Sequence, residues 1–99
     1  MHARMTTLEG PADRMDEGLR QVREHALPQL QQQDGFKRYL ALGDRHSGKL
    51  LGISFWESEE AMRAAEGLGD RTRSETAGAI SDTIAGVERY EVGLFEMSS

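Results

Sequence analysis

Four stretches of the chain have the apolar pattern of β-strands: residues 3–9, 36–42, 49–56 and 87–97. The first alternates loosely and stops at Gly10-Pro11, a dipeptide typical of turns. The second and third are joined by a polar segment that has a glycine at each end. This pairing predicts a β-hairpin, and the fourth stretch predicts a long final strand.

The segment after Pro11 has the spacing of an amphipathic helix. Its apolar residues recur at intervals of four, three and four positions: Met15, Leu19, Val22 and Ala26. Proline costs little at the start of a helix because the N–H that it lacks would have no partner there. Pro28 predicts that this helix ends or kinks, with Leu27 and Leu30 anchoring an irregular last turn.

A second helix is predicted from Ser58, whose side chain can cap the free N–H groups of a first turn. Gly67 and Gly69 are expected to interrupt this helix, and Asp70 to begin a second piece that Gly86 ends. The second piece has a sparse apolar stripe: Ala77, Ile80 and Ile84.

The predicted order is β-α-β-β-α-β. A right-handed crossover in each half turns this order into an α+β, ferredoxin-like fold, a four-stranded antiparallel sheet with both helices on one face. Residues 1–99 are expected to form a single domain, since the chain has no internal repeat or linker.

Both faces of the predicted sheet carry apolar residues. In the third strand Leu51, Ile53 and Phe55 point one way, whereas Leu50 and Trp56 point the other. Two helices cover only one face, so we expect a second copy of the chain to cover the other in a closed dimer. Small residues, Gly52 and Ser54, are expected to leave space between the two sheets for a small molecule.

Composition narrows the possible functions. The chain has no cysteine, which excludes disulfides, thiolate nucleophiles and cysteine-bound zinc. Its net charge is −5 and no run of lysine or arginine exceeds two residues, so nucleic-acid binding is not expected. No apolar stretch approaches the roughly 18 residues of a membrane span, and no secretory signal pattern opens the chain. A cytoplasmic location is expected.

Three aromatic residues are candidates for a substrate site. Trp56 lies at the junction of the third strand and the second helix, where it would either stack on an aromatic substrate or pack the helix onto the sheet. Tyr39 and Tyr90 carry hydroxyls that could donate to a phenolate or to reduced oxygen. The alternative for both is a buried ring with its hydroxyl at the surface.

Charged residues supply the other candidates. His25, near the end of the first helix, is a candidate base toward an acidic phenol, or a residue that favours the negative end of the helix dipole. Arg38 is expected on the same strand face as Phe36 and Leu40, partly buried and able to hold an anion. Arg73 would border the pocket mouth. For both arginines the alternative is a surface ion pair.

The chain resembles the antibiotic biosynthesis monooxygenase (ABM) domain family of the dimeric α+β barrel superfamily. Three features carry the resemblance: the Gly35-Phe36 entry to the hairpin, the Trp-x-Ser-x-Glu-Ala junction at residues 56–61, and the late strand at residues 88–92. The resemblance implies a homodimer whose sheets enclose a barrel, with a pocket in each subunit between sheet and helices. Some members oxygenate polycyclic phenols or quinols without a cofactor, and others degrade haem.

Two departures from the family pattern bear on function. The chain has no asparagine, although the better-known oxygenases and the haem degraders use a pocket asparagine, and residues 58–85 contain no histidine to ligate haem. Haem degradation is therefore disfavoured. No paired histidine spacing or carboxylate triad predicts a metal site.

The first functional hypothesis is a cofactor-independent monooxygenase of small aromatic or polyketide-like phenols and quinols. Trp56 and Tyr39 would be pocket walls, Arg38 an anion partner and His25 a base, with no cofactor. The alternative is a non-catalytic module of the same dimeric fold that binds a small hydrophobic or aromatic molecule, or a partner, and turns nothing over.

Overall fold

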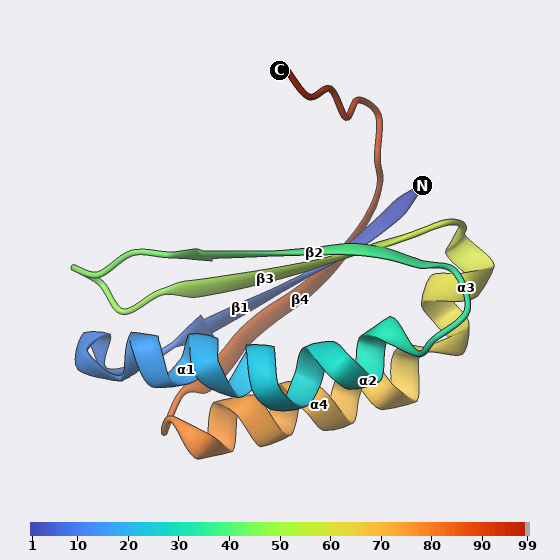
Figure 1. The fold of residues 1–99 in the computed structure, drawn as a ribbon. Helices are drawn as coiled ribbons and strands as arrows, with labels where there is room; N and C mark the ends of the chain where they lie inside the picture. Colours follow the sequence, from blue (N-terminus) through green and yellow to red (C-terminus); the bar gives the residue numbers. More distant parts are fainter. Residues whose placement is uncertain (99) are drawn as a thin grey trace.

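The computed structural model describes residues 1–98 as one antiparallel sheet with all the helices packed against one of its faces (Figure 1). The four strands are β1 (His2–Glu9), β2 (Phe36–Gly43), β3 (Leu50–Trp56) and β4 (Thr83–Glu91). They lie in the order β2-β3-β1-β4, and every neighbouring pair is antiparallel. This topology confirms the expected ferredoxin-like α+β fold.

The first helical segment consists of four consecutive elements: the 3₁₀ turn η1 (Ala12–Arg14), α1 (Met15–Gln21), the π-turn η2 (Val22–Ala26) and α2 (Leu27–Gln31). Pro28 lies in the first turn of α2. The N–H of Leu27 bonds to the carbonyl of Val22, five residues back, which makes this turn wider than an α-helical turn. The wider turn lets the helix continue through Pro28, which has no N–H to donate. The proline thus widens the helix locally and does not end it.

The second helical segment is divided into α3 (Glu59–Ala64) and α4 (Glu66–Ala79). Ser58 caps α3 as predicted, because its Oγ accepts the N–H of Ala61 at 3.1 Å. The break falls at Ala65 and not at Gly67 or Gly69, both of which are helical in α4.

The last strand begins and ends earlier than the sequence pattern predicts. Helix α4 ends before Ser81, which has a left-handed φ of 59° and turns the chain into β4. Ile84 therefore lies in β4 and not on the helix. Strand β4 stops at Glu91, and residues 92–98 have no regular structure, although the N–H of Val92 still bonds to the carbonyl of Met1 at 2.9 Å.

A bulge in β2 changes which residues share a face. The pairing of β2 with β3 shifts between Phe36 and Arg38. One extra residue reverses the alternation of side chains, so Phe36 packs on the helix side together with Tyr39. The expectation that Phe36 and Arg38 share a face is therefore wrong.

Two hydrophobic clusters join the helices to the sheet. One contains Leu8, Met15, Leu50, Ala77 and Ile80, and the other contains Leu30, Trp56, Met62 and Ala65. No helix in residues 1–98 is long and apolar enough to cross a membrane.

Loss of the Ser58 cap gives a direct test of the start of α3. We expect Ser58→Ala to lower the free energy of unfolding by about 1 kcal/mol, because the N–H of Ala61 loses its acceptor. Ser74→Ala, at an exposed position inside α4, should change it much less. Urea unfolding of both variants measures the difference, and equal midpoints would contradict the capping role.

Candidate functional site

A cavity lies between the helices and the sheet. Its walls come from β1, β2 and β3 on one side and from η2, α2 and α4 on the other. The open space is about 50 Å³, room for a few water molecules. Its lining combines apolar side chains, which include Leu8, Val22, Ala26 and Leu30, with polar ones, which include Arg4, Thr6, Tyr39, Thr72, Arg73 and Thr76.

The cavity exists because one row of the sheet carries small side chains. Ala41, Gly52 and Thr6 are direct neighbours across β2, β3 and β1. The rows around them carry larger side chains, and the helices rest on those rows. Gly52 and Ser54 do line a cavity, but it lies beneath the helices, so the expected position between two sheets is wrong.

The next row of the same face is polar across all four strands. Tyr39 pairs with Ser54, Ser54 with Arg4, and Arg4 with Arg89. Since directly paired residues point to the same face, Tyr39, Ser54 and Arg4 of this row form one polar edge of the cavity. Ser54 also accepts the indole N–H of Trp56 at 2.9 Å.

Tyr39 places its hydroxyl over Gly52, where a side chain at position 52 would collide with it. Burial raises the pKa of Tyr39 to about 12. At neutral pH the phenol therefore stays protonated, so Tyr39 can donate a hydrogen bond to a ligand and does not act as a base.

Arg4 is almost completely buried, with 3% of its surface exposed. Its Nη2 donates to the carbonyl of Met62 at 2.6 Å and to Glu66 Oε2 at 2.8 Å. Its guanidinium lies 5.7 Å from the centre of the Trp56 ring, and Nη1 lies against Gly69, where a Cβ would collide with it. Burial lowers the pKa of Arg4, and the attraction of Glu66 opposes that shift.

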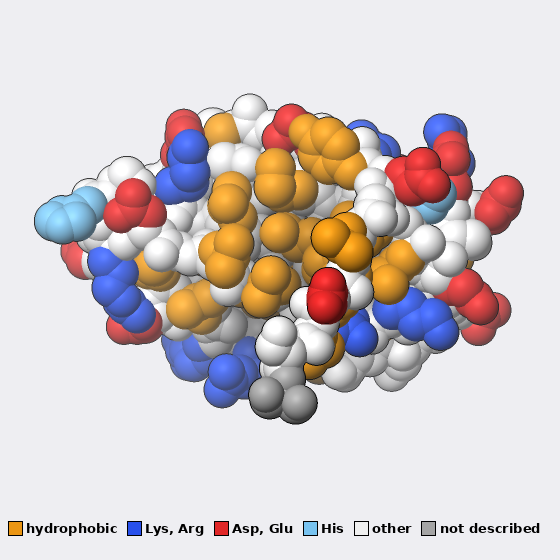
Figure 2. Space-filling view, turned by 90° about the horizontal axis from the view of Figure 1, so that it is seen from above, with side chains coloured by type: hydrophobic (Ala, Val, Ile, Leu, Met, Phe, Trp, Pro, Cys, Tyr) orange, Lys and Arg blue, Asp and Glu red, His pale blue; other side chains and the backbone are white. Residues whose placement is uncertain are grey.

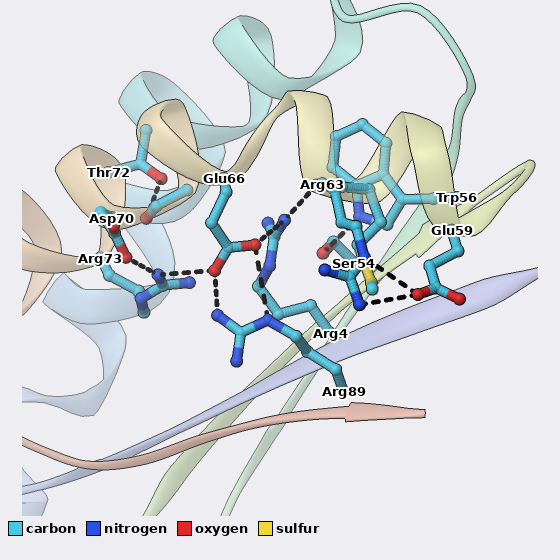
Figure 3. Close-up of polar contacts among 12 residues, drawn as sticks. Arg4, Ser54, Trp56, Glu59, Arg63, Glu66, Asp70, Thr72, Arg73 and Arg89 are labelled. Atoms are coloured by element: carbon cyan, nitrogen blue, oxygen red, sulfur yellow. Dashed lines mark hydrogen bonds and ion pairs between the residues drawn. The ribbon is translucent and has the colours of Figure 1, made fainter. Parts of the chain in front are cut away.

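Glu66 connects three arginines from three elements (Figure 3). It forms ion pairs with Arg4 of β1, Arg73 of α4 and Arg89 of β4, and Arg73 also pairs with Asp70. Partial burial opposes ionisation, but the hydrogen bonds and charges of Arg89 and Arg4 outweigh it and hold the pKa of Glu66 below its ordinary value. Glu66 is therefore an ionised counter-ion at neutral pH.

The structure brings only some of the sequence-predicted residues together. Tyr39 and Arg73 line the cavity. Trp56 has no exposed surface and does not line the cavity, because its ring packs edge-on against Phe36 at 5.4 Å and its N–H is bonded to Ser54.

The other candidates lie elsewhere. Arg38 is exposed on the opposite face of the sheet, 4.4 Å from the centre of the Phe95 ring, because the bulge in β2 turns it away from the helices. Tyr90 is 52% exposed on that same face and donates to Glu88 at 2.5 Å. His25 is exposed on the helix surface and is absent from the cavity lining.

Sequence reasoning missed Arg4 and Glu66. The alternation of residues in β1 places Arg4 on the same face as Thr6 and Leu8, and this pattern could have predicted that Arg4 lies beneath the helices. Its ion pair with Glu66 spans 62 positions of the chain, which no local pattern reveals. Among residues 1–98 no group of three or more histidine, aspartate or glutamate side chains is arranged to hold a metal ion.

The chain thus has a four-stranded ferredoxin-like sheet with a polar-edged cavity beneath its helices. The antibiotic biosynthesis monooxygenase family model matches residues 1–76. The chain belongs to this family. A curated relative, uncharacterized protein Rv2557 of Mycobacterium tuberculosis, is 35% identical over 93% of this chain. The chain spans about two fifths of that relative's length, since the match covers 41% of it.

Solved structures share the fold over nearly the whole chain. A Deinococcus radiodurans protein that bears the antibiotic biosynthesis monooxygenase name is 25% identical, with a TM-score of 0.73 over 100% of this chain and 99% of its own. A point mutant of MhuD, bound to manganese protoporphyrin IX, has a TM-score of 0.71 and 19% sequence identity, and the match covers 99% of this chain and 100% of the mutant's. SnoaB, a cofactor-independent oxygenase from Streptomyces nogalater, has a TM-score of 0.65 and 16% sequence identity, and the match covers 95% of this chain and 94% of SnoaB. Family and fold together support a monooxygenase or small-molecule-binding role.

Acid sensitivity tests the role of Glu66 as counter-ion. Because the folded pKa of Glu66 lies below its ordinary value of 4.5, its ionisation stabilises the fold above that pH and ceases to do so as pH falls through the folded pKa. Wild type should therefore lose stability relative to Glu66→Gln as the pH falls below about 4.5 and through the folded pKa. Urea unfolding across this range measures the difference.

A matched control is Glu75→Gln, which removes a carboxylate from an exposed pair with Arg71 at 3.7 Å on the same helix. This variant should follow the wild-type pH profile. Parallel profiles for wild type and Glu66→Gln would contradict the counter-ion role.

Proposed function

We propose that the protein is a cofactor-independent monooxygenase that holds a small phenol or quinol in the cavity beneath its helices. One observation carries the proposal: the cavity presents an apolar wall from η2 and α2 and a polar wall of hydrogen-bond donors, Tyr39 and Arg4 of the sheet and Arg73 of α4. An aromatic ring with one ionisable oxygen matches both walls.

The chemistry follows from the donors. In the reaction class a phenol and O₂ become a quinone and H₂O: one oxygen atom replaces the hydrogen of a ring C–H as C=O, and the other leaves as water with that hydrogen and the phenolic proton, while the ionised substrate gives its electrons to oxygen. Donors that stabilise a phenolate favour the form that reacts. Tyr39 contributes a hydrogen-bond donor, since its raised pKa keeps it protonated.

A haem group does not fit this cavity. None of the three histidines, His2, His25 and His46, lines it, so it offers no imidazole to ligate iron. The proposal therefore contains no haem step, in contrast to the porphyrin-bound state of MhuD.

A second candidate is a non-catalytic module that binds a small molecule and turns nothing over. The observation in its favour is the lack of a base: among the described residues that line the cavity, none is a carboxylate or an imidazole. Both candidates use the same cavity, and oxygen consumption separates them.

The proposed working unit is a homodimer joined through the sheet face that the helices leave bare. Figure 2 shows hydrophobic side chains gathered at the centre of this face and charged side chains around them. Leu40, Ile53 and Met5 form one row across it, and Leu40 remains 46% exposed. An exposed apolar patch at the centre of a sheet face is typical of an interface.

Oxygen consumption tests the catalytic proposal. With a panel of one- and two-ring quinols, we expect protein-dependent oxygen uptake measured with an oxygen electrode. Tyr39→Phe should lower kcat/KM by about tenfold or more, because a donor to the ionised oxygen is lost. Tyr90→Phe removes the same hydroxyl from the opposite face and should leave the rate unchanged. Saturable binding without protein-dependent oxygen uptake would favour the non-catalytic module.

Sedimentation tests the dimer. Leu40→Glu places an unpaired charge in the apolar patch of the bare face and should weaken self-association by about tenfold or more. Ser74→Glu adds the same charge on an exposed position of α4 and should not change it. A wild-type protein that sediments as a monomer at all concentrations would refute the dimer.

A further inference from the structure

The guanidinium of Arg4 has unused hydrogen-bonding capacity at the cavity. Both of its hydrogen bonds leave from Nη2. Its Nε is buried and has no partner within residues 1–98. Nearly every buried N–H in a folded protein has an acceptor, so the protein itself does not use the full hydrogen-bonding capacity of this guanidinium, which lines the cavity.

The charges around the cavity are unbalanced toward the positive. Three arginines, Arg4, Arg73 and Arg89, share two carboxylates, Glu66 and Asp70. At neutral pH this cluster carries a formal charge of +1. Arg4 and Arg73 line the cavity, whereas neither carboxylate does, so the excess charge faces the ligand space.

The absence of a side chain at Gly69 keeps the space beside Arg4 open. A Cβ at this position would lie 2.6 Å from Nη1 of Arg4 and 3.5 Å from Nη1 of Arg73. Glycine thus lets α4 bring both guanidinium groups to one corner of the cavity. Planar guanidinium groups bind carboxylate or phenolate oxygens through several N–H donors at once.

We propose that the cavity is selective for an organic anion: an aromatic ring that carries a carboxylate or phenolate, with the oxyanion bound by Arg4 and Arg73. The inference rests on the proposed small-molecule role of the cavity and names the ligand's charge. Glu66 is the internal counter-ion with which the ligand competes for Arg4.

Benzoate and benzamide provide a matched pair of probes, since they share ring and shape and differ in charge. Calorimetric titration measures both affinities. Emission from Trp56, the only tryptophan and a neighbour of Arg4, reports binding independently. We expect benzoate to bind at least tenfold more tightly than benzamide.

Glu66→Gln separates an anion-binding role of the cluster from a purely structural one, because only the anion-binding role predicts tighter binding of benzoate. Removal of the competing carboxylate should tighten benzoate binding about threefold or more and leave benzamide unchanged. Arg4→Lys keeps the charge but removes the planar donors, and it should weaken benzoate at least tenfold. Arg71→Gln removes an exposed positive charge from the same helix, outside the cavity, and controls for net charge.

The outcomes separate the inference from the function on which it rests. Equal binding of benzoate and benzamide would overturn the anion site and leave the small-molecule role intact. Binding of neither probe would overturn the anion site, and the quinol panel would then decide the function by itself. Weaker benzoate binding to Glu66→Gln would also overturn it, even if Arg4→Lys failed to fold.

Discussion

The burial of one guanidinium, that of Arg4, constrains the arrangement of sheet and helices. A charge with 3% exposure needs partners, and the break between α3 and α4 provides them. Met62 lies in the last turn of α3, where carbonyls lack intrahelical donors, and Glu66 is the first residue of α4. A continuous helix would occupy that carbonyl, so the break at Ala65 and the buried arginine depend on each other.

The sizes of the side chains along the sheet explain why a cavity remains between sheet and helices in so small a domain. Bulky rows around Trp56 and Leu50 hold the helices off the sheet, and the small row at Gly52 lies between them. Filling that gap with larger side chains would bury more apolar surface and stabilise the fold. The sequence instead places glycine, alanine and hydroxyl residues at these positions, which is the pattern of a site and not of an optimised core.

Alternation and helical spacing were sufficient to predict the strands, the capped helix and the topology, because those patterns are local. The bulge at Phe36 was not predictable from them. The stretch from Phe36 still has the apolar pattern of a strand, but the extra residue places Phe36 on the opposite face of the sheet from the one that simple alternation predicts. Arg38 was misplaced for that reason. Tyr39 was predicted at a pocket, but Arg4 was not, because a single arginine in a strand reads as a solvated residue until its distant partner Glu66 is known.

The removal of a proton from the substrate is the remaining constraint on the proposed oxygen chemistry in this cavity. Tyr39 stays protonated at neutral pH, and the described residues of the lining include no carboxylate or imidazole to act as base. In the proposed reaction the substrate would then reach the reactive state by its own ionisation, assisted by the positive charge of Arg4 and Arg73. Such a site would select substrates by acidity as well as by shape, because only a phenol or enol ionised in the cavity can give an electron to oxygen.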